Sequence, residues 1–321
     1  MASIILIDKD RVAGVINNMA LVKQAVLEAL RVHYEATYVQ PPKVYLQEGP
    51  RAHTADRIIA MPVYVKSYAP VSGLKWIGSK HTNPQRGLNR ASALIVLNDQ
   101  TTNAPMALLD GTLISAMRTT AVSLIAIDRL RPSFRTAAIL GMGRLGKMHA
   151  EILVKEYHSV QEIRCFSQHA LFDDLMNQIP QIVRCSTFED ALKGADVVVT
   201  TTTANSPYIE PHHVPGDPLL INLSLMDFTI PIFTDSDIIV DDWRQCRLAK
   251  KVLKEAIDQG LVLQADAHEL SEVLYGAMKH KQFPGRTIVN PLGMALEDII
   301  VAWEVYQQVK DDPSLPLFEI E

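Results

Sequence analysis

The chain has 321 residues, of which 48% are hydrophobic and 21% are charged, and its formal net charge is −5. This composition is typical of a globular protein, and the length is enough for about two domains. A mildly acidic chain lacks the basic surplus that nucleic acid or an anionic membrane attracts, so neither is expected as a partner.

The cysteines and the first residues bear on metal sites and on the compartment. Cys165, Cys185 and Cys246 are odd in number and far apart, so neither a disulfide framework nor a zinc site is expected, and we predict no metal. Residues 1–8 lack the basic segment of a signal peptide. No apolar run is long enough to span a bilayer. We therefore expect a cytoplasmic protein without a membrane partner.

The first third of the chain combines one helix with short strands. A strand is expected at Ile4–Ile7, and apolar residues at helical spacing predict a helix over Leu21–His33. From Lys43 to Asp99 no helical period is present, and turn residues separate strand-like runs. This pattern predicts a mostly antiparallel sheet, with strands at Lys43–Leu46, Arg57–Val65, Gly73–Ile77 and Ala91–Leu97.

A long apolar helix is predicted over Leu113–Leu130, with Pro132 beyond its end. After it, strands that are apolar throughout alternate with helices, which is typical of a parallel sheet covered on both faces. The expected strands are Ala137–Leu140, Ile163–Phe166, Val197–Thr201, Leu219–Leu223 and Asp237–Val240, and the expected helices are Lys147–Tyr157, His169–Gln178 and Phe188–Leu192. The last helix, Met294–Gln308, is amphipathic and is expected to pack back on the first domain.

The strongest motif is the glycine loop Gly141-Met142-Gly143-Arg144-Leu145-Gly146. It follows a predicted buried strand and opens a predicted helix, which is the context that dinucleotide binding requires. Its three glycines permit a tight turn, close approach of a pyrophosphate and close packing of helix on strand. The helix N-terminus offers free N–H groups, and Arg144 could add a phosphate contact. The alternative is a glycine-rich turn that holds no ligand.

The tip of the next strand decides between the two nicotinamide dinucleotides in many such folds. An acidic residue there binds the ribose of NAD, and a nearby arginine accommodates the extra phosphate of NADP. Here the tip carries Ser167 and Gln168, which could hydrogen-bond to either form. We expect NAD, with NADP left open.

Three charged residues stand in apolar surroundings. Arg118 lies in the middle of an apolar helix, so it needs either a bound anion or an internal acid as its partner. Lys75 lies between Leu74 and Trp76 in a strand, and periodicity alone favours the solvent side of the sheet. Asp227 follows a predicted strand, where a carboxylate is either a general base at the ligand crevice or a turn residue.

These motifs resemble the ornithine cyclodeaminase/μ-crystallin family over nearly the whole chain. The segments that carry the resemblance are Pro41-Pro42-Lys43, Ile59-Ala60-Met61-Pro62, Gly73-Leu74-Lys75-Trp76, Ser115-Ala116-Met117-Arg118-Thr119-Thr120-Ala121, the glycine loop, Met226-Asp227 and Asn290-Pro291-Leu292-Gly293-Met294-Ala295-Leu296-Glu297-Asp298. Other strings, among them Lys75 to His81 and Arg90-Ala91-Ser92, are most similar to the branch that oxidises N-(2-amino-2-carboxyethyl)-L-glutamate.

The resemblance implies an α/β fold with two domains. One is a Rossmann dinucleotide-binding domain, placed at residues 119–298. The other is an α/β domain with a mostly antiparallel sheet, placed at residues 1–118 plus 299–321, which binds substrate and forms a homodimer. The implied reaction is NAD(P)-dependent oxidation of an N-substituted amino acid to 2-oxoglutarate and L-2,3-diaminopropionate, a siderophore or antibiotic precursor.

The resemblance also assigns roles to residues. Lys75 and Asp227 are expected to be catalytic, with Asp227 activating the water that attacks an imine. The substrate-binding residues are expected to be Lys43, Met61, Lys75 and Arg118. Besides the glycine loop, the residues expected at the dinucleotide are Thr119, Ser167, Gln168, Thr201, Thr202 and Gly293. The polar segment Ser79 to Asn83, with Arg90, either binds a distal carboxylate or is a solvated loop.

Two departures from the family pattern bear on the substrate. Cyclodeaminases have a glutamate in the segment that is Ile59-Ala60-Met61 here, and a carboxylate-binding arginine where this chain has Lys43. A lysine keeps the charge but loses the two-pronged contact. The absence of that glutamate argues against ornithine as substrate. An ornithine or lysine cyclodeaminase is kept as one alternative, and a non-catalytic dinucleotide-binding protein is the other.

Overall fold

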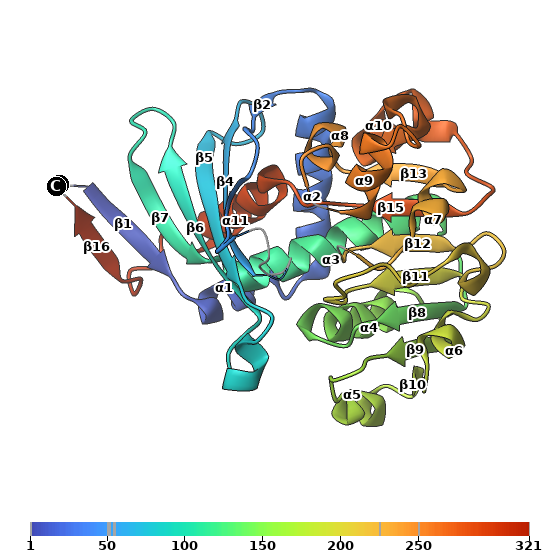
Figure 1. The fold of residues 1–321 in the computed structure, drawn as a ribbon. Helices are drawn as coiled ribbons and strands as arrows, with labels where there is room; N and C mark the ends of the chain where they lie inside the picture. Colours follow the sequence, from blue (N-terminus) through green and yellow to red (C-terminus); the bar gives the residue numbers. More distant parts are fainter. Residues whose placement is uncertain (1, 50–52, 54–55, 225, 250, 321) are drawn as a thin grey trace. The chain divides into compact units, whose positions relative to one another are not determined.

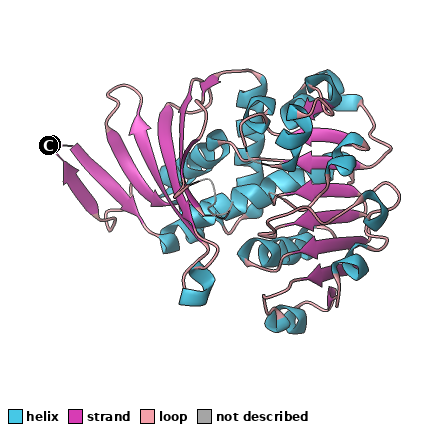
Figure 2. Cartoon of the chain, in the orientation of Figure 1, coloured by secondary structure: helices cyan, strands magenta, loops and turns pink. Residues whose placement is uncertain are grey.

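The computed structural model describes residues 2–49, 53, 56–224, 226–249 and 251–320. The chain divides into two compact units, drawn as ribbons in Figures 1 and 2: Met1–Val122 with Gly293–Glu321, and Ser123–Leu292. Helix α3 (Gly111–Leu130) begins in the first unit and ends in the second. The division gives residues 119–122 and 293–298 to the first unit, whereas the boundaries expected from the sequence place both segments in the second.

The first unit is built on a sheet whose strand order is β16-β1-β7-β6-β5-β4-β2, with β3 also paired to β4. Its strands are β1 (Ala2–Ile7), β2 (Tyr38–Val39), β3 (Val44–Leu46), β4 (Arg57–Val65), β5 (Val71–Ser79), β6 (Ala91–Asp99), β7 (Pro105–Asp110) and β16 (Leu317–Ile320). Every pair in it is antiparallel except β1 with β7. The prediction of a mostly antiparallel sheet is confirmed.

One face of this sheet packs against helices of the same unit. Alternate residues of the central strands are buried, and α11 (Ala295–Val309) packs on β4, β5 and β6, with α2 (Met19–Tyr34) beside it. The approach is close, because a Cβ added at Gly73 would lie 2.7 Å from Ile299. Helix α1 (Lys9–Ile16) contacts α11 as well. The last helix therefore packs back on the first domain, as predicted.

The second unit holds a parallel sheet with strand order β10-β9-β8-β11-β12-β15-β13-β14. The strands are β8 (Thr136–Leu140), β9 (Glu162–Phe166), β10 (Ile182–Arg184), β11 (Val197–Thr200), β12 (Leu219–Asn222), β13 (Asp237–Val240), β14 (Ala267–Glu269) and β15 (Thr287–Asn290). The helices are α4 (Arg144–Glu156), α5 (Asp173–Gln178), α6 (Phe188–Leu192), α7 (Ile230–Thr234), α8 (Trp243–Cys246), α9 (Val252–Asp258) and α10 (Leu270–Tyr275). Strands β11, β12 and β15 are buried at every position, which explains their continuous apolar runs.

The strand order indicates where a ligand crevice is expected. From β8 the chain adds β9 and β10 on one side and then β11 and β12 on the other, as the strands of this unit in Figure 1 show. The direction of winding thus reverses between β8 and β11. In doubly wound α/β sheets, ligands bind beyond the carboxyl ends of the strands at this reversal. The fold class predicted from the sequence is confirmed.

Several elements differ from the prediction. The helix expected over His169–Gln178 begins only at Asp173. The elements that were not predicted are β2, β7, β10, β14, β15, β16, α1, α7, α8, α9 and α10. Among the described residues, no helix has the length and apolarity that crossing a membrane would require.

Candidate active site

The glycine loop follows β8 and packs against the residue that follows β11. Gly141 has a positive φ of 92°, and a Cβ on it would lie 2.9 Å from the backbone of Thr201. A Cβ on Gly146 would lie 2.0 Å from the carbonyl oxygen of Gly141. Thr201 supports the same turn, since its hydroxyl donates to that carbonyl at 2.5 Å. Sterics therefore require glycine at both positions.

Gly143 is a different case, because a Cβ there would meet nothing within 4 Å. Its backbone is extended, and as the N-cap residue of α4 it has no side chain to bond to the N–H groups of the first turn. Arg144 is exposed beside it, whereas Met142 is fully buried in the core. Open space before a free helix N-terminus at the reversal of the sheet fits a pyrophosphate. The residues present therefore suit a dinucleotide.

The tip of β9 carries Ser167 and Gln168, as the sequence indicated. The Ser167 hydroxyl accepts a hydrogen bond from the N–H of Ala170 at 3.2 Å, which fixes the turn. Gln168 is exposed. A serine and an amide can bond to a ribose hydroxyl or to a phosphate, so the geometry is compatible with either dinucleotide.

Asp227 lies just beyond β12 in the same unit and is completely buried. One carboxylate oxygen, Oδ1, accepts hydrogen bonds from the hydroxyls of Thr202 at 2.5 Å and Tyr208 at 3.0 Å. The other, Oδ2, is buried and lacks a hydrogen-bond partner among the described residues. Burial raises the pKa of Asp227, and the hydroxyl donors oppose that shift. A carboxyl group with a raised pKa and one uncommitted oxygen is suited to take up and release a proton.

A second charged group lies within the first unit. Lys75 is 1% exposed, and its Nζ donates to Asp298 Oδ2 at 2.5 Å and to the Ser115 hydroxyl at 3.3 Å. Arg118 donates from Nε to Asp298 Oδ1 at 3.0 Å and from a terminal nitrogen to Glu297 at 2.8 Å. Helix α11 supplies both acids in its first turn. Asp298 thus bridges the two cations, one from β5 and one from α3.

The position of Lys75 corrects the expectation from periodicity, which placed it on the solvent side. Lys75 belongs to the buried alternating set of β5, with Val71 and Gly73, on the face that α11 covers. Burial lowers the pKa of Lys75 to about 8, although the adjacent Asp298 carboxylate pulls in the opposite direction. Because that value is near physiological pH, the amine can exist in both charge states.

Comparison with known proteins identifies the family of the chain. The sequence profile of the ornithine cyclodeaminase/mu-crystallin family matches residues 6–312. This chain belongs to that family. It is 35% identical, over 92% of its own length and 91% of the relative's, to N-((2S)-2-amino-2-carboxyethyl)-L-glutamate dehydrogenase of Staphylococcus aureus.

Solved structures of the family show the same fold. Thermococcus litoralis Δ1-pyrroline-2-carboxylate reductase, solved with NADH and L-proline, superposes with a TM-score of 0.87 at 21% identity, covering 98% of this chain and 99% of its own. An archaeal alanine dehydrogenase dimer with bound NAD gives 0.86 at 24% identity, covering 99% and 100%.

The remaining predicted site residues lie after β11, on the sheet side of the first unit and on α3. Thr201 and Thr202 follow β11, the first bonded to the glycine loop and the second to Asp227. Lys43 and Met61 lie in the first unit; Met61 pairs with Lys75 across β4 and β5, and Lys43 is close enough to lower the pKa of Lys75. The Thr119 hydroxyl donates to the Ser115 carbonyl of its own helix.

Gly293 was predicted at the dinucleotide, but its described contact is with Arg118. Its φ is 79°, and a Cβ on it would lie 2.5 Å from a guanidinium nitrogen. Glycine is therefore required for the guanidinium to fit, and the structure assigns Gly293 to the charged cluster of the first unit.

Sequence reasoning missed the acids that hold the cations. Glu297 and Asp298 are the internal partners that Arg118 was expected to need, and both are 0% exposed. The available signal was two adjacent acids inside the apolar stretch Leu296 to Ile300. Tyr208 was also missed, because only the fold brings it to Asp227.

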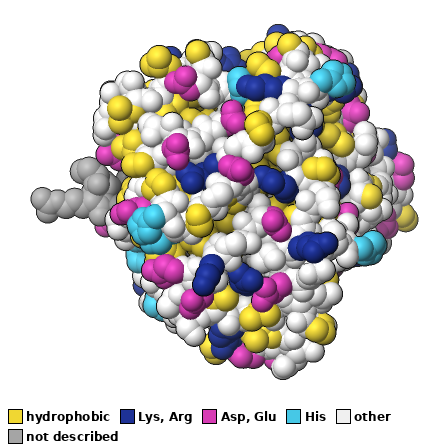
Figure 3. All heavy atoms as spheres, turned by 90° about the vertical axis from the view of Figure 1, so that its right-hand side faces the viewer, with side chains coloured by type: hydrophobic (Ala, Val, Ile, Leu, Met, Phe, Trp, Pro, Cys, Tyr) yellow, Lys and Arg dark blue, Asp and Glu magenta, His cyan; other side chains and the backbone are white. Residues whose placement is uncertain are grey.

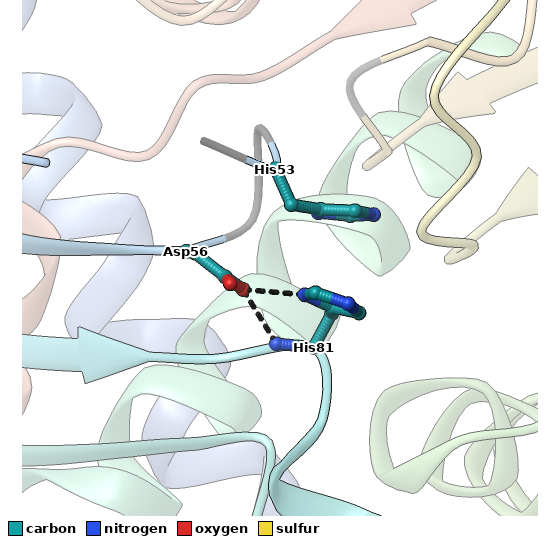
Figure 4. Close-up of side chains that lie close together, drawn as sticks. All are labelled: His53, Asp56 and His81. Carbon is teal, nitrogen blue, oxygen red and sulfur yellow. Dashed lines mark hydrogen bonds and ion pairs between the residues drawn. The ribbon is translucent and has the colours of Figure 1, made fainter. Parts of the chain in front are cut away.

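A further cluster lies near the end of the first unit's sheet where β4 starts (Figure 4). His53 stacks on His81 with ring centroids 4.1 Å apart, and Asp56 Oδ1 accepts from the backbone N–H of His81 at 2.7 Å and from its Nδ1 at 2.8 Å. These three residues offer ligand atoms within 4.8 Å of one another. Arg90, however, is close enough to lower the pKa of His53. A guanidinium group at this distance disfavours a metal cation there.

Proposed function

We propose that this protein is an NAD-dependent oxidoreductase that oxidises N-(2-amino-2-carboxyethyl)-L-glutamate. Water enters the reaction, 2-oxoglutarate and L-2,3-diaminopropionate leave, and one NADH and one proton form. The observation that carries the proposal is the presence of a dinucleotide loop and of the buried cations Lys75 and Arg118 in one chain, which is 35% identical to a dehydrogenase of this substrate.

The charges of the first unit suit a carboxylate. Lys43, Lys75 and Arg118 contribute three cations against the two acids Glu297 and Asp298, so the five groups carry a net charge of +1 when all are ionised. Buried acids hold the cations in place, because an unpaired buried charge is very costly. We assign the α-carboxylate to Arg118 and Lys75, with Lys43 adding attraction.

The second unit supplies the cofactor site and the acid/base group. Gly143 and the start of α4 hold the pyrophosphate, and Ser167 with Gln168 meets the ribose. When bound, the nicotinamide would supply the acceptor for a hydride from the α-carbon of the glutamyl part. Asp227 takes a proton from the water that attacks the resulting imine, with Thr202 and Tyr208 fixing its carboxylate. General acid–base catalysis of this kind contributes about 10²- to 10⁴-fold.

We further propose that the active form is a homodimer. The face of the first unit's sheet that turns away from Lys75 and Met61 exposes large apolar side chains, which are Val44, Leu46, Ile58, Tyr64, Trp76 and Leu94. An apolar patch of this kind on a sheet indicates a protein interface. The archaeal alanine dehydrogenase of this fold is a dimer. In contrast, the face drawn in Figure 3 intersperses basic and acidic side chains.

The decisive test incubates purified protein with NAD or NADP and with N-(2-amino-2-carboxyethyl)-L-glutamate or ornithine. We expect NADH to accumulate with the first substrate only, with 2-oxoglutarate and 2,3-diaminopropionate identified by mass spectrometry. Conversion of ornithine to proline without net NADH would instead identify a cyclodeaminase. Tight dinucleotide binding without turnover of any amino acid in a broad panel would identify a non-catalytic binding protein.

A further inference from the structure

We propose that Arg57 and Arg90 form a second anion subsite, which binds the substrate carboxylate farthest from the reacting carbon. This proposal rests on the proposed function, since it assigns the distal part of that substrate. The subsite lies wholly within the first unit, on the same sheet that carries Lys75.

The strand register puts Arg57 on the face of Lys75. Lys75 pairs with Met61, and Ser79 pairs with Arg57. Side chains alternate between the two faces of a strand, so Lys75 and Ser79 share one face, and Met61 and Arg57 share it with them. The Arg57 guanidinium lies 5.5 Å from the ring centre of Tyr45, which pairs with Ile59 of the same alternating set. The four residues from Lys75 to Ser79 span about 13 Å.

The two arginines lack the acids that normally accompany such side chains. Among the described residues, neither has an ion pair with a carboxylate, and the Arg57 Nε is buried without a hydrogen-bond partner. Asp56, the acid of the neighbouring cluster, is instead occupied by two hydrogen bonds from His81 (Figure 4). Arg57 is half-buried and Arg90 is exposed, so the buried Nε of Arg57 is the polar atom that lacks a partner, and a bound anion would supply one.

The two arginines flank the end of β5, because Arg57 pairs with Ser79 and the Arg90 carbonyl accepts a hydrogen bond from the N–H of Lys80 at 2.9 Å. Their like charges repel each other. Desolvation lowers the pKa of both guanidinium groups, and Arg57 further lowers the pKa of Arg90. Arg90 nevertheless remains accessible to solvent, so an anion can reach it from solution. A carboxylate between two adjacent guanidinium groups would replace this repulsion with charge-assisted hydrogen bonds. Arg118 differs from both arginines, because it forms ion pairs with Glu297 and Asp298.

The chemistry of the substrate matches this spacing. A carboxylate held at Lys75 and Arg118 leaves the glutamyl side chain, with its own carboxylate, to extend along the strands. Arginine side chains reach back several ångströms from their Cα atoms, which shortens the gap of about 13 Å. Monocarboxylate amino acids would engage the Lys75 end alone. The pair Arg57 and Arg90 therefore selects for dicarboxylates.

The experiment measures binding of 2-oxoglutarate and 2-oxobutanoate to the NADH-loaded protein by calorimetry. These 2-oxo acids differ in the distal carboxylate. We expect wild-type protein to prefer 2-oxoglutarate by about 10-fold or more, and Arg57→Gln and Arg90→Gln each to remove most of that preference. Binding of 2-oxobutanoate should persist in both variants, which shows that they fold. Arg86→Gln, at an exposed arginine of the nearby 3-10 helix Asn83–Arg86, should keep the wild-type preference.

Two outcomes separate this proposal from the proposed function. If 2-oxoglutarate binds wild-type protein no better than 2-oxobutanoate, or if the double variant Arg57→Gln/Arg90→Gln keeps the preference, the subsite is wrong. If the preference depends on both arginines but N-(2-amino-2-carboxyethyl)-L-glutamate is not turned over, the subsite stands and the proposed reaction is overturned.

Discussion

Asp227 concentrates several unusual properties in one side chain. It is fully buried, its pKa is raised by burial, and two hydroxyl groups donate to the same carboxylate oxygen. Asp227→Asn retains an acceptor for both hydroxyls but cannot take up a proton. We expect kcat to fall by about 100-fold or more, while the dissociation constant for NADH changes little. Unchanged turnover would remove Asp227 from the mechanism.

A substitution at Tyr208 tests the role of Asp227 through the pH dependence of the reaction. The Tyr208 hydroxyl lowers the pKa of Asp227 by bonding to its charged form, so Tyr208→Phe should raise that pKa further. Because the base is active when ionised, the rise of kcat/KM with pH should move to higher pH in this variant. The measurement is a pH–rate profile beside wild type. A profile that does not move would mean that another group limits the rate.

The residue scale also shows what a sequence can predict of a site. Arg118 and Asp227 could be found because each breaks an apolar or strand-end pattern. The burial of Lys75 could not, since its strand neighbours Leu74 and Trp76 suggested the opposite face. Which face α11 covers depends on packing between residues more than 200 positions apart, such as the bond from Lys75 to Asp298.

At the scale of elements, local context was informative and long-range pairing was not. The glycine loop, its strand and its helix are contiguous, so the motif predicted their arrangement correctly. The edge strand β16 and the inserted strand β15 were missed because pairing with distant partners stabilises them. Tertiary contacts decide such short strands more than propensity does.

The loop glycines give a matched pair of variants. Gly146→Ala places a Cβ 2.0 Å from a backbone oxygen, so α4 must shift from β8, and we expect a lower melting temperature and lost dinucleotide binding. Gly143→Ala meets no protein atom, and its backbone suits alanine. Its stability should fall by about 1 kcal/mol at most, yet NADH should bind at least 10-fold more weakly if the pyrophosphate approaches this residue.

Thermal unfolding and NADH titration of the two variants, beside Gly14→Ala, separate steric damage from ligand contact. Gly14 is an exposed glycine of α1 with open space around its Cβ position. Its variant should bind NADH as wild type does and unfold at the same temperature or slightly above it, because alanine favours a helix more than glycine does. Gly143→Ala binding NADH as tightly as wild type would argue against a pyrophosphate at this helix N-terminus.

At the scale of the whole molecule, one face of the first unit's sheet exposes large apolar side chains. Trp76 and Leu94 are cross-strand neighbours on it, 41% and 49% exposed. Introducing charges there, as in Trp76→Glu/Leu94→Glu, would force two carboxylates per subunit into an apolar interface, which is strongly unfavourable. We expect light scattering after gel filtration to show a dimer for wild type and a monomer for this variant. Leu171→Glu, at a 75% exposed leucine of the second unit, should remain dimeric. A monomeric wild-type protein at micromolar concentration would contradict the proposed assembly.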